Sequence, residues 1–336
     1  MKENSGLLPA GHTIAWEQFE MPGIKKMPTN DLDAFAPLMK AEETNGIKIY
    51  NEKFAVSFNK ETGWLQWYVL NNNSIIKEPL VPYFWRAATD NDIGNSQQIR
   101  CAVWQHAGDF SKLDSFNVED ISSNKVCIKT MHYLSSVDAM YFVQYLVSAN
   151  GNVQVSVKMK AGNKYFPEMP RFGMRVILDD HFEKAIWFGR GPFDNYWDRK
   201  YAAPVDLYSM PADSLFFPYP RAQESGYRTD VRWMALQNKN GLGIMAEGSP
   251  LISTGVLHFD MKKLDFDRNA IENNHGGSMT HDPLIWWNID YKQMGGGGDN
   301  AWGDKTHAEY MLPYRDYEYS FLLRPVYGNE DMGANK

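Results

Sequence analysis

The sequence predicts an all-β protein built as a large antiparallel super-sandwich, and three observations support this. Apolar and polar residues alternate over 153–159, which follow the strand-like run 141–147 across a turn at 149–152, the pattern of a hairpin. Similar turn signals recur along the chain, whereas convincing amphipathic helices are scarce. Many strands, frequent turns and few helices are typical of sandwiches and barrels. At 336 residues, a large two-sheet sandwich fits best.

Further strands follow from the same signals. A turn at 60–63 and another at 238–241 predict two more hairpins. One short helix is expected over 97–106. The remaining strands are predicted, in chain order, at 53–58, 64–69, 233–237, 243–247, 252–259, 284–291, 308–312 and 317–323.

The first 45 residues differ from the rest. Residues 12–21 have the pattern of one isolated strand, which is not stable by itself. We therefore interpret 1–21 as the end of a preceding domain and 22–45 as a linker. The sandwich is expected over 46–328, with a tail at 329–336.

The composition limits the function classes. Hydrophobic residues make up 43% and charged residues 22%, as in soluble globular proteins. The net charge of −7 disfavours nucleic acid as a partner, and no apolar run approaches the length of a membrane span. No signal peptide is expected in residues 1–10. The compartment stays open between the cytoplasm and the periplasm of a bacterium. Cys101 and Cys127 are expected to be free, buried thiols.

Aromatic side chains are frequent, at 14% of residues with 11 tryptophans. Flat rings can stack on the C–H faces of sugars, so a tryptophan-rich β protein favours carbohydrate binding. The alternative is that most of these rings fill a β core.

The glycine run 295–298 lacks the lysine and the βαβ context of a phosphate-binding loop. The polar residues that follow it surround one aromatic residue, Trp302. Such a loop could present Trp302 outward as a binding platform; the alternative is a tryptophan in the core.

The segment 84–94 groups an arginine with Asp90, Asn91 and Asp92. It lacks the alternating acids and closing glutamate of a calcium loop. If the segment is extended, Asp90 and Asp92 could face one side as a catalytic pair. We favour a structural turn network in which Arg86 neutralises the carboxylates.

The segment 189–199 is similarly polar. Its arginines, Arg190 or Arg199, could form an ion-pair clasp with Asp194 or Asp198. Such a clasp contributes little stability unless it is buried.

A fourth polar segment, 220–228, contains Glu224 and Arg228. Glu224 is the one glutamate that we consider as a lone acid or base. The eight histidines show no metal-binding spacing, so no metal site is expected, and His275 and His281 lie six residues apart in a loop.

Together, the four polar segments resemble the carboxyl-terminal, small-chain portion of the β-galactosidases of glycoside hydrolase family 2. Residues 11–18 resemble the last strand of the immunoglobulin-like domain that precedes this portion. The motifs that carry the resemblance are Trp85-Arg86 with Asp90-Asn91-Asp92-Ile93-Gly94; Gly189, Gly191-Pro192, Asn195-Tyr196 and Asp198-Arg199; Pro220, Glu224, Gly226 and Arg228; Asn288 and Asp290; and Met294-Gly295, Gly297-Gly298-Asp299 and Trp302.

The resemblance implies a fold like that of galactose mutarotase, resting on a separate (β/α)₈ barrel that holds both catalytic glutamates. It implies that Trp302, with Asp299 and Asn300, contributes to the sugar site. The loop of Gly94, Asn95, Ser96 and Gln97 would border the mouth of that site. The other motif residues would be structural: Arg86, Asp90, Asn91, Asp92, Asn195, Asp198, Arg199, Glu224 and Arg228.

No βαβ alternation is present in this sequence, so the barrel is absent and no catalytic residue is expected here. The resemblance implies a retaining β-galactosidase acting on terminal β-D-galactosides such as lactose, in a homo-oligomer. Cofactors are expected to be none in this chain; Mg and Na would belong to the absent barrel. The partner is the barrel-containing remainder of the enzyme, and the isolated chain is expected to be inactive.

Three alternatives stay open. The chain could be a natural small subunit that pairs with a large subunit. It could be a stand-alone carbohydrate-binding module. It could also be a mutarotase-like epimerase that uses Glu224 with His275 or His281.

Overall fold

The computed structural model describes residues 2–19, 32–265, 276–300 and 302–328, and it divides the chain into two compact units, 1–30 and 31–336. In the first unit, one isolated β-bridge joins Ser5 to Leu8. The strand predicted over 12–21 is not formed by residues 12–19, and its last two residues lie outside the described residues. That this segment completes a sheet of a preceding domain stays a prediction.

The second unit contains part of the segment expected to be a linker. A 3₁₀ helix, η1 (Leu32–Ala34), precedes strand β1 (Met39–Glu43), which pairs antiparallel with β2 (Gly46–Tyr50). The expected start of the sandwich at residue 46 is therefore wrong. The polar residues 44–45 are not the end of a linker; they form the tight turn of this first hairpin.

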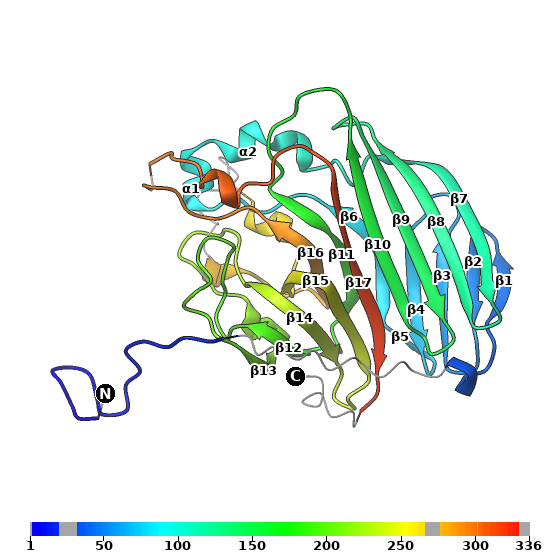
Figure 1. The fold of residues 1–336 in the computed structure, drawn as a ribbon, viewed down its shortest axis with the longest axis horizontal. Helices are drawn as coiled ribbons and strands as arrows, with labels where there is room; N and C mark the ends of the chain where they lie inside the picture. The colour runs from blue at the N-terminus through cyan, green and yellow to red at the C-terminus, as the bar shows by residue number, and fades with distance from the viewer. Residues whose placement is uncertain (1, 20–31, 266–275, 301, 329–336) are drawn as a thin grey trace. The chain divides into compact units, whose positions relative to one another are not determined.

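The smaller sheet has five antiparallel strands in sequence order. Figure 1 shows it in blue, at one side of the second unit. Its strands are β1, β2, β3 (Phe54–Asn59), β4 (Leu65–Leu70) and β5 (Asn73–Ser74).

The larger sheet has twelve strands, in the order β13-β12-β14-β15-β17-β10-β9-β8-β7, with β16, β11 and β6 as a branch that starts from β15. All its pairs are antiparallel. The strands are β6 (Ile76–Tyr83), β7 (Ser111–Ser122), β8 (Lys125–Leu134), β9 (Ala139–Ser148), β10 (Val153–Ala161), β11 (Arg171–Asp179), β12 (Lys184–Arg190), β13 (Val205–Pro211), β14 (Tyr227–Gln237), β15 (Gly243–Leu257), β16 (Leu284–Gln293) and β17 (Tyr317–Val326).

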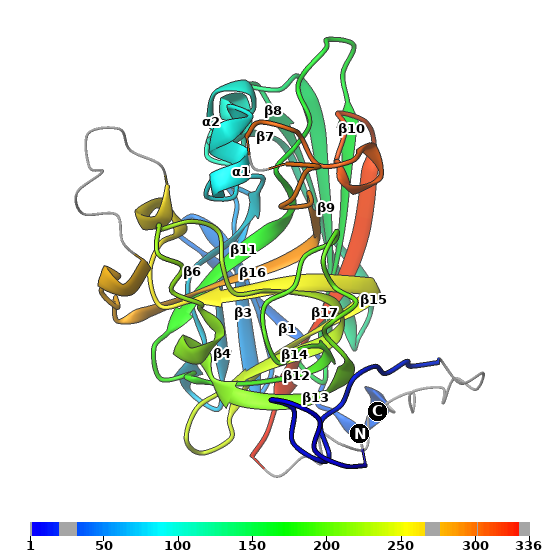
Figure 2. The same cartoon turned by 90° about the vertical axis from the view of Figure 1, so that its left-hand side faces the viewer.

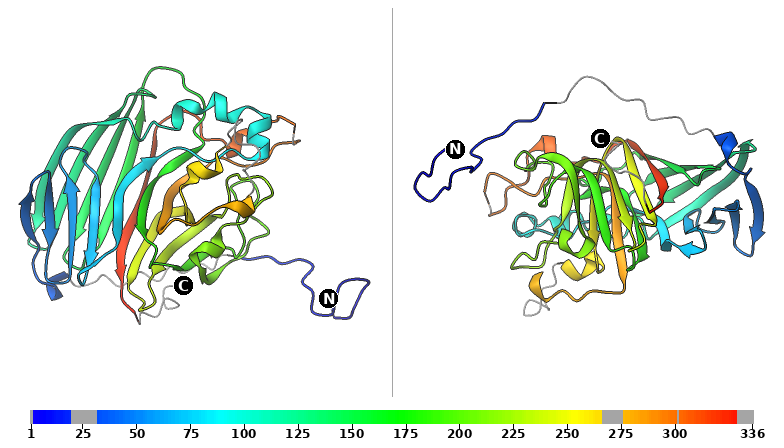
Figure 3. Two further views of the ribbon diagram at one scale, coloured as in Figure 1. Left: turned by 180° about the vertical axis from the view of Figure 1, so that it is seen from behind. Right: turned by 90° about the horizontal axis from the view of Figure 1, so that it is seen from below.

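The two sheets share one hydrophobic core. The ring of Trp64, just before β4, stacks on that of His132 of β8 at a centroid distance of 3.8 Å. The rings of Phe58 and Tyr145 lie 5.0 Å apart. The left part of Figure 3 shows the blue and green layers face to face. The predicted all-β antiparallel sandwich is confirmed.

The three predicted hairpins are confirmed as β3–β4, β9–β10 and β14–β15. Burial alternates along β9 and β10, because one face of each strand lies on the core. The run predicted over 252–259 is the second half of β15.

The prediction of a strand at 308–312 is wrong. Residues Ala308–Tyr310 form the 3₁₀ helix η7. The carbonyl of Tyr310 accepts a hydrogen bond from the N–H of Gly295, and that of Leu312 accepts one from Met169. Because these two carbonyls accept hydrogen bonds from two different loops, residues 308–312 do not pair with a neighbouring strand.

Helical structure is short throughout the described residues. The helix expected over 97–106 is present in two pieces, α2 (Gln97–Arg100) and the 3₁₀ helix η2 (Ala102–Trp104). It is preceded by α1 (Asp90–Gly94). The other 3₁₀ turns are η3 (Ala212–Leu215), η4 (Met261–Leu264) and η6 (Gly276–Ser278). None of the described helices has the length and apolar character that a bilayer span requires.

Both cysteines are free and buried, as predicted. Burial raises the pKa of the Cys101 thiol to about 12 and also raises the pKa of Cys127. A thiol that stays protonated is a poor nucleophile, so neither cysteine suggests covalent chemistry.

Candidate functional site

The glycine run follows β16, and the other motif loops hold it in place. The guanidinium of Arg86, which is fully buried, donates to the carbonyls of Met294 and Gly295 and to both carboxylate oxygens of Asp92. The amide of Asn91 donates to the carbonyl of Gly296 over 3.2 Å. Of the carboxylates that Arg86 was predicted to neutralise, it binds that of Asp92, whereas Asp90 pairs with Arg221.

The segment 189–199 holds the same run from the other side. The carboxylate of Asp198 accepts hydrogen bonds from the N–H groups of Gly296, at 3.1 Å, and Gly297, at 2.7 Å. A Cβ added to Gly295 would lie 2.5 Å from Thr306 Oγ1 and 2.7 Å from Asp198 Cγ. Glycine is therefore required where the backbone passes this closely.

The less favoured alternative, in which Asp90 and Asp92 share one side of an extended segment, is wrong, because residues 90–94 form α1. Thr89 caps α1 in a capping box with Asp92, which turns Asp92 inward to Arg86. Asp90 is instead exposed and pairs with Arg221 over 3.0 Å. The two carboxylates cannot act as one catalytic pair in this arrangement.

The aromatic residue of the glycine-run loop is exposed. Trp302 has 91% of its surface accessible, and its N–H donates to Asn300 Oδ1 over 2.8 Å. Asp299 Oδ1 lies 2.7 Å from His307 Nε2, and this contact raises the pKa of His307. The loop thus presents an indole outward, which is the arrangement that the resemblance implied, and the alternative of a core tryptophan is wrong.

The loop expected to border the site lies next to the loop of Trp302. A Cβ built on Gly303 would lie 3.1 Å from the carbonyl oxygen of Gly94. Figure 2 shows α1 and α2 beside the orange segment after β16. The side-chain and backbone oxygens of Asn95 accept hydrogen bonds from Arg100. Ser96 adopts a left-handed backbone conformation. Gln97 is fully buried.

Glu224 belongs to a buried ion cluster that sequence reasoning did not find as a whole. Arg171 Nη2 lies 3.1 Å from Glu224 Oε2, and Arg171 Nη1 lies 2.9 Å from Asp290 Oδ2. Tyr227 donates to Asp290, and Gln293 donates to Glu224. Burial raises the pKa of Glu224, while Arg171 opposes that rise. Arg171 is the first residue of β11, which also contains the charged residues Arg175 and Asp179, so no signal in the sequence singled it out.

Two further motif residues satisfy backbone groups. Asn195 accepts from the N–H and the hydroxyl of Thr229. Arg228 donates to three carbonyls, those of Leu215, Gly226 and Pro192. Both side chains therefore connect the loop 191–199 to β14.

The predicted clasp of 189–199 is only partly present. Arg199 Nη2 lies 3.5 Å from Asp194 Oδ2. Arg190 pairs instead with Asp230, at the start of β14, over 2.6 Å. The carboxylate of Asp198 instead accepts hydrogen bonds from the N–H groups of the glycine run.

The motif loops enclose a polar pocket of about 250 Å³. Residues of all four polar segments contribute to its wall: Thr89, Asp90, Asn91, Tyr196, Arg199, Tyr219, Gln223, Glu224 and Gly296. A larger hollow of about 690 Å³ lies elsewhere, over strands β8, β9, β10 and β17, and contains none of the motif residues named as site candidates. The smaller pocket is therefore the one that the motifs build.

The histidines named for an epimerase do not complete such a site among the described residues. The ring of His281 stacks on that of His258, with centroids 5.3 Å apart. His275 lies outside the described residues. Glu224, their expected partner, is engaged by Arg171 and Gln293.

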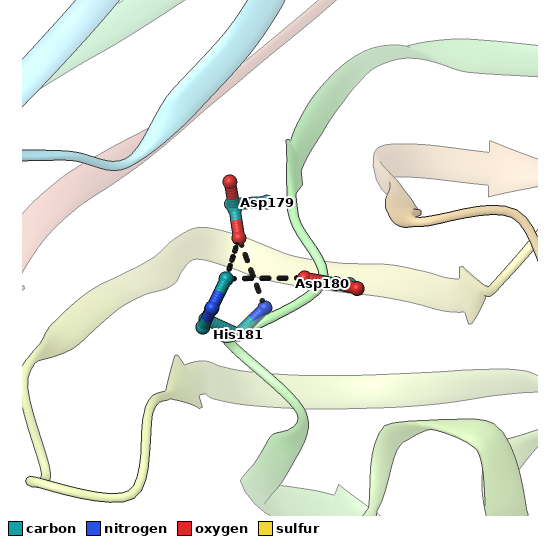
Figure 4. A group of neighbouring side chains, drawn as sticks. All are labelled: Asp179, Asp180 and His181. Atoms are coloured by element: carbon teal, nitrogen blue, oxygen red, sulfur yellow. Dashed lines mark hydrogen bonds and ion pairs between the residues drawn. The ribbon is translucent and has the colours of Figure 1, made fainter.

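One group of side chains in the described residues has the geometry of possible metal ligands. Asp179, Asp180 and His181 bring their ligand atoms within 4.8 Å of one another at the end of β11 (Figure 4). Asp179 also pairs with Lys77 over 2.8 Å. Burial would raise the pKa of Asp179, but the hydrogen bonds from Lys77 and His181 keep it well below its ordinary value. These contacts describe a surface ion-pair group.

Comparison with known proteins gives three results. The model of the family described as "Beta galactosidase small chain" matches residues 50–323. A β-galactosidase of Priestia megaterium is 30% identical over 97% of this chain, and one of Pseudoalteromonas haloplanktis is 27% identical over 94%. The chain spans only 31% and 30% of the length of these two relatives.

Among solved structures, the galactose 1-epimerase of Lactobacillus acidophilus is similar with a TM-score of 0.47 and 10% identity, over 87% of this chain and 98% of the epimerase. An aldose epimerase homologue of C. elegans has a TM-score of 0.44 and 11% identity, over 87% and 99%.

Proposed function

The chain belongs to the β-galactosidase small-chain family, and from this premise we propose that it completes the sugar site of a retaining β-galactosidase without supplying either catalytic carboxylate. The observation that carries the proposal is the exposed indole of Trp302 on a loop anchored by buried charges. An outward-facing indole offers a flat apolar surface on which the C–H face of a sugar can stack.

The state of the carboxylates supports the second half of the proposal. A retaining glycosidase needs two carboxyl groups about 5–5.5 Å apart, one of which must be free to attack the sugar. Glu224 and Asp290 are held together by Arg171 in the interior, and Asp92 is bound by Arg86. A carboxylate that accepts from a buried arginine is a poor nucleophile, so both catalytic groups are expected from the barrel-containing remainder.

The position of the Trp302 loop supports its role in binding. Asp299 and Asn300 stiffen the loop through His307 and the N–H of Trp302. The neighbouring segment from Gly94 to Gln97 lies at the same end of the sandwich (Figure 2). A galactoside would stack its apolar face on Trp302 while this segment borders the entrance.

The name of the relatives supports the proposed substrate class. The proposed partner is supported by the share of the relatives' length, about 70%, that this chain does not span. We propose terminal β-D-galactosides such as lactose as substrates. The partner is the barrel-containing remainder, either in the same polypeptide or as a separate large subunit, and the whole enzyme is a homo-oligomer. Any Mg or Na would belong to the barrel.

The test is complementation. The purified chain is assayed with a chromogenic β-galactoside, alone and with the barrel-containing remainder. We expect no turnover alone and turnover on mixing. Trp302→Ala should then raise KM, because the sugar loses a stacking contact that contributes about 1–3 kcal/mol to its binding.

The control is Tyr133→Ala, which removes an exposed ring from β8, a strand that contributes no residue to the motif loops. It should leave KM unchanged. Turnover by the chain alone that survives repurification would refute the absence of catalytic carboxylates. An unchanged KM in Trp302→Ala would refute the stacking role.

A further inference from the structure

One partly buried carboxylate joins the two loops on which the proposed sugar site depends. Arg100, at the end of α2, and Lys305, in the segment that follows Trp302, both pair with the same carboxylate oxygen, Oε1 of Glu168. Arg100 Nη1 donates a hydrogen bond to this oxygen, and Lys305 Nζ lies 3.6 Å from it. Glu168 itself belongs to the connection between β10 and β11, so three segments that are distant in sequence meet at one atom.

The backbone on either side of Glu168 is fixed to the core. The carbonyl of Pro167 accepts a hydrogen bond from the indole N–H of Trp104, which is fully buried. The N–H of Met169, also buried, donates to the carbonyl of Leu312 over 2.7 Å. The side chain of Glu168 is only 14% exposed. The carboxylate therefore has a defined position from which it can hold two cations.

On one side, Arg100 connects this carboxylate to the segment 94–97, which borders the entrance. Its guanidinium donates to the backbone oxygen of Asn95 over 3.1 Å and to the side-chain oxygen of the same residue over 2.8 Å. Asn95 is the C-cap of α1. The contacts of Arg100 therefore link Glu168 to the end of α1.

On the other side, Lys305 closes the loop that carries Trp302. A Cβ built on Gly298 would lie 3.1 Å from the carbonyl oxygen of Lys305, so the two ends of the loop lie close together. The stem that leads into Gly298 is held by Arg86 and Asp198. Lys305 makes the corresponding contact for the stem that follows Trp302, and its partner is Glu168.

Glu168 compensates both cations at this junction. Among the described residues, it is the only carboxylate that pairs with either Arg100 or Lys305. Burial would raise the pKa of Glu168, but hydrogen bonds from its own N–H and from Arg100, together with the charges of Arg100 and Lys305, lower it. The carboxylate is therefore ionised at neutral pH. Without it, two uncompensated cations would face each other and repel.

We propose that Glu168 is a positioning residue that holds the Trp302 loop against the segment 94–97, acting through Lys305 and Arg100. Its effect on sugar binding rests on the proposed function, in which these two loops are parts of one site. Loss of the carboxylate would let the loops separate, so the indole would no longer keep one orientation toward the entrance. The carboxylate itself does not touch the sugar.

The first measurement follows the loop without any sugar. The 336-residue chain is labelled with fluorotryptophan, and the fluorine NMR signal of Trp302 is assigned by its loss in Trp302→Phe. Glu168→Gln keeps the shape of the side chain and removes its charge, so it should shift this signal while those of the buried Trp233 and Trp287 stay in place. Lys305→Gln should shift it as well, and this variant serves if Glu168→Gln fails to fold.

The second measurement uses the chain mixed with the barrel-containing remainder. Glu168→Gln should raise KM for the chromogenic β-galactoside about two- to fivefold and leave kcat unchanged, as expected for the loss of a partly exposed ion pair that supports binding. In the Trp302→Ala background it should have no further effect, because the indole that it positions is gone. A general loss of stability would instead persist in both backgrounds.

Two further variants test whether the charge is responsible. Glu168→Asp keeps the carboxylate and should bring the Trp302 signal and KM closer to wild type than Glu168→Gln does. Glu119→Gln is the matched control, because Glu119 pairs with Lys129 between β7 and β8, strands that contribute no residue to either loop. It should change neither the signal nor KM.

A Trp302 signal that moves in neither Glu168→Gln nor Lys305→Gln would overturn the proposal. So would a rise in KM that Glu168→Gln adds in full to that of Trp302→Ala. An unchanged KM in Trp302→Ala alone would refute the stacking role of the indole, whereas the positioning of the loop by Glu168 is decided by the fluorine signal.

Discussion

At the scale of single residues, the buried arginines explain why the motif segments are so polar. Arg86 and Arg171 are both fully buried, and each faces at least one carboxylate. Removing one member of a buried pair leaves an uncompensated charge and typically costs about 3–5 kcal/mol. The motif residues therefore maintain the loops that position the candidate site, rather than reacting themselves.

Asp230 is the residue whose ion pairs close the loop 191–199. Arg190 and Lys200, at the two ends of this loop, both bind its carboxylate. Burial alone would raise the pKa of Asp230, but the hydrogen bonds from Arg190 and Lys200 hold it below its ordinary value of 3.8. A depressed pKa means that the folded state favours the ionised form.

We predict that Asp230→Asn lowers stability by about 1–2 kcal/mol at pH 7. The contribution of Asp230 is fully present above its unfolded pKa and is lost as the pH falls through the lower, folded value. The difference between wild type and variant should therefore be constant at neutral pH and shrink below about pH 4. Urea unfolding between pH 3 and pH 7 measures it.

The control for this experiment is Asp114→Asn, which changes an exposed carboxylate on β7. It should have little effect at any pH in the range. A destabilisation by Asp230→Asn that did not change with pH would mean that the geometry of the side chain matters and its charge does not.

Sequence reasoning identified the polar motif residues but only part of their pairing. Arg86 with Asp92 could be predicted because the two lie six residues apart in one segment. Arg190 with Asp230 could not, since the partner belongs to another strand and is brought close only by the sheet. Arg171 was missed for the same reason.

At the scale of elements, the predicted hairpins are those whose turns contain a glycine. The turn between β3 and β4 illustrates why. Gly63 has a φ of +77°, and Asn59 accepts from the N–H groups of Glu61 and Thr62 through its side chain. The glycine therefore provides a left-handed conformation that other residues rarely adopt.

We predict that Gly63→Ala destabilises the protein by about 1–3 kcal/mol. The added Cβ would be strained at this φ and would lie 2.7 Å from Leu113 Cδ1 and 2.8 Å from His132 Cε1. Thermal unfolding measures the loss. Gly277→Ala is the control, because its Cβ would meet nothing within 4 Å. Equal melting temperatures for the two variants would contradict the prediction.

The strands that the sequence did not reveal lack such turn signals. β11 is buried on nearly every position, so its alternation is absent, and β7 is largely exposed. α1 was missed because five residues are too few for a helical period to show. Residues 308–312 have side chains that are compatible with a strand, but they do not pair with a neighbouring strand, and 308–310 form a 3₁₀ helix.

At the scale of the whole second unit, the two sheets form a sandwich around one core, and this core is what makes the site rigid. The motif loops belong to the larger sheet, yet its strands β8 and β9 pack on rings of the smaller sheet or its turns, such as Phe58 and Trp64. The smaller sheet should therefore contribute to the stability of a site that it does not touch.

We predict that Phe58→Ala, in β3, destabilises both sheets together by about 3–5 kcal/mol, because it opens a cavity in the shared core. Hydrogen exchange measured at β16, in the larger sheet, should lose as much protection free energy as exchange at β3. Ile121→Ala, at an exposed position of β7, is the control and should change neither. If β16 kept its wild-type protection while β3 lost it, the sheets would fold separately, and the loop that presents Trp302 would depend on the larger sheet alone.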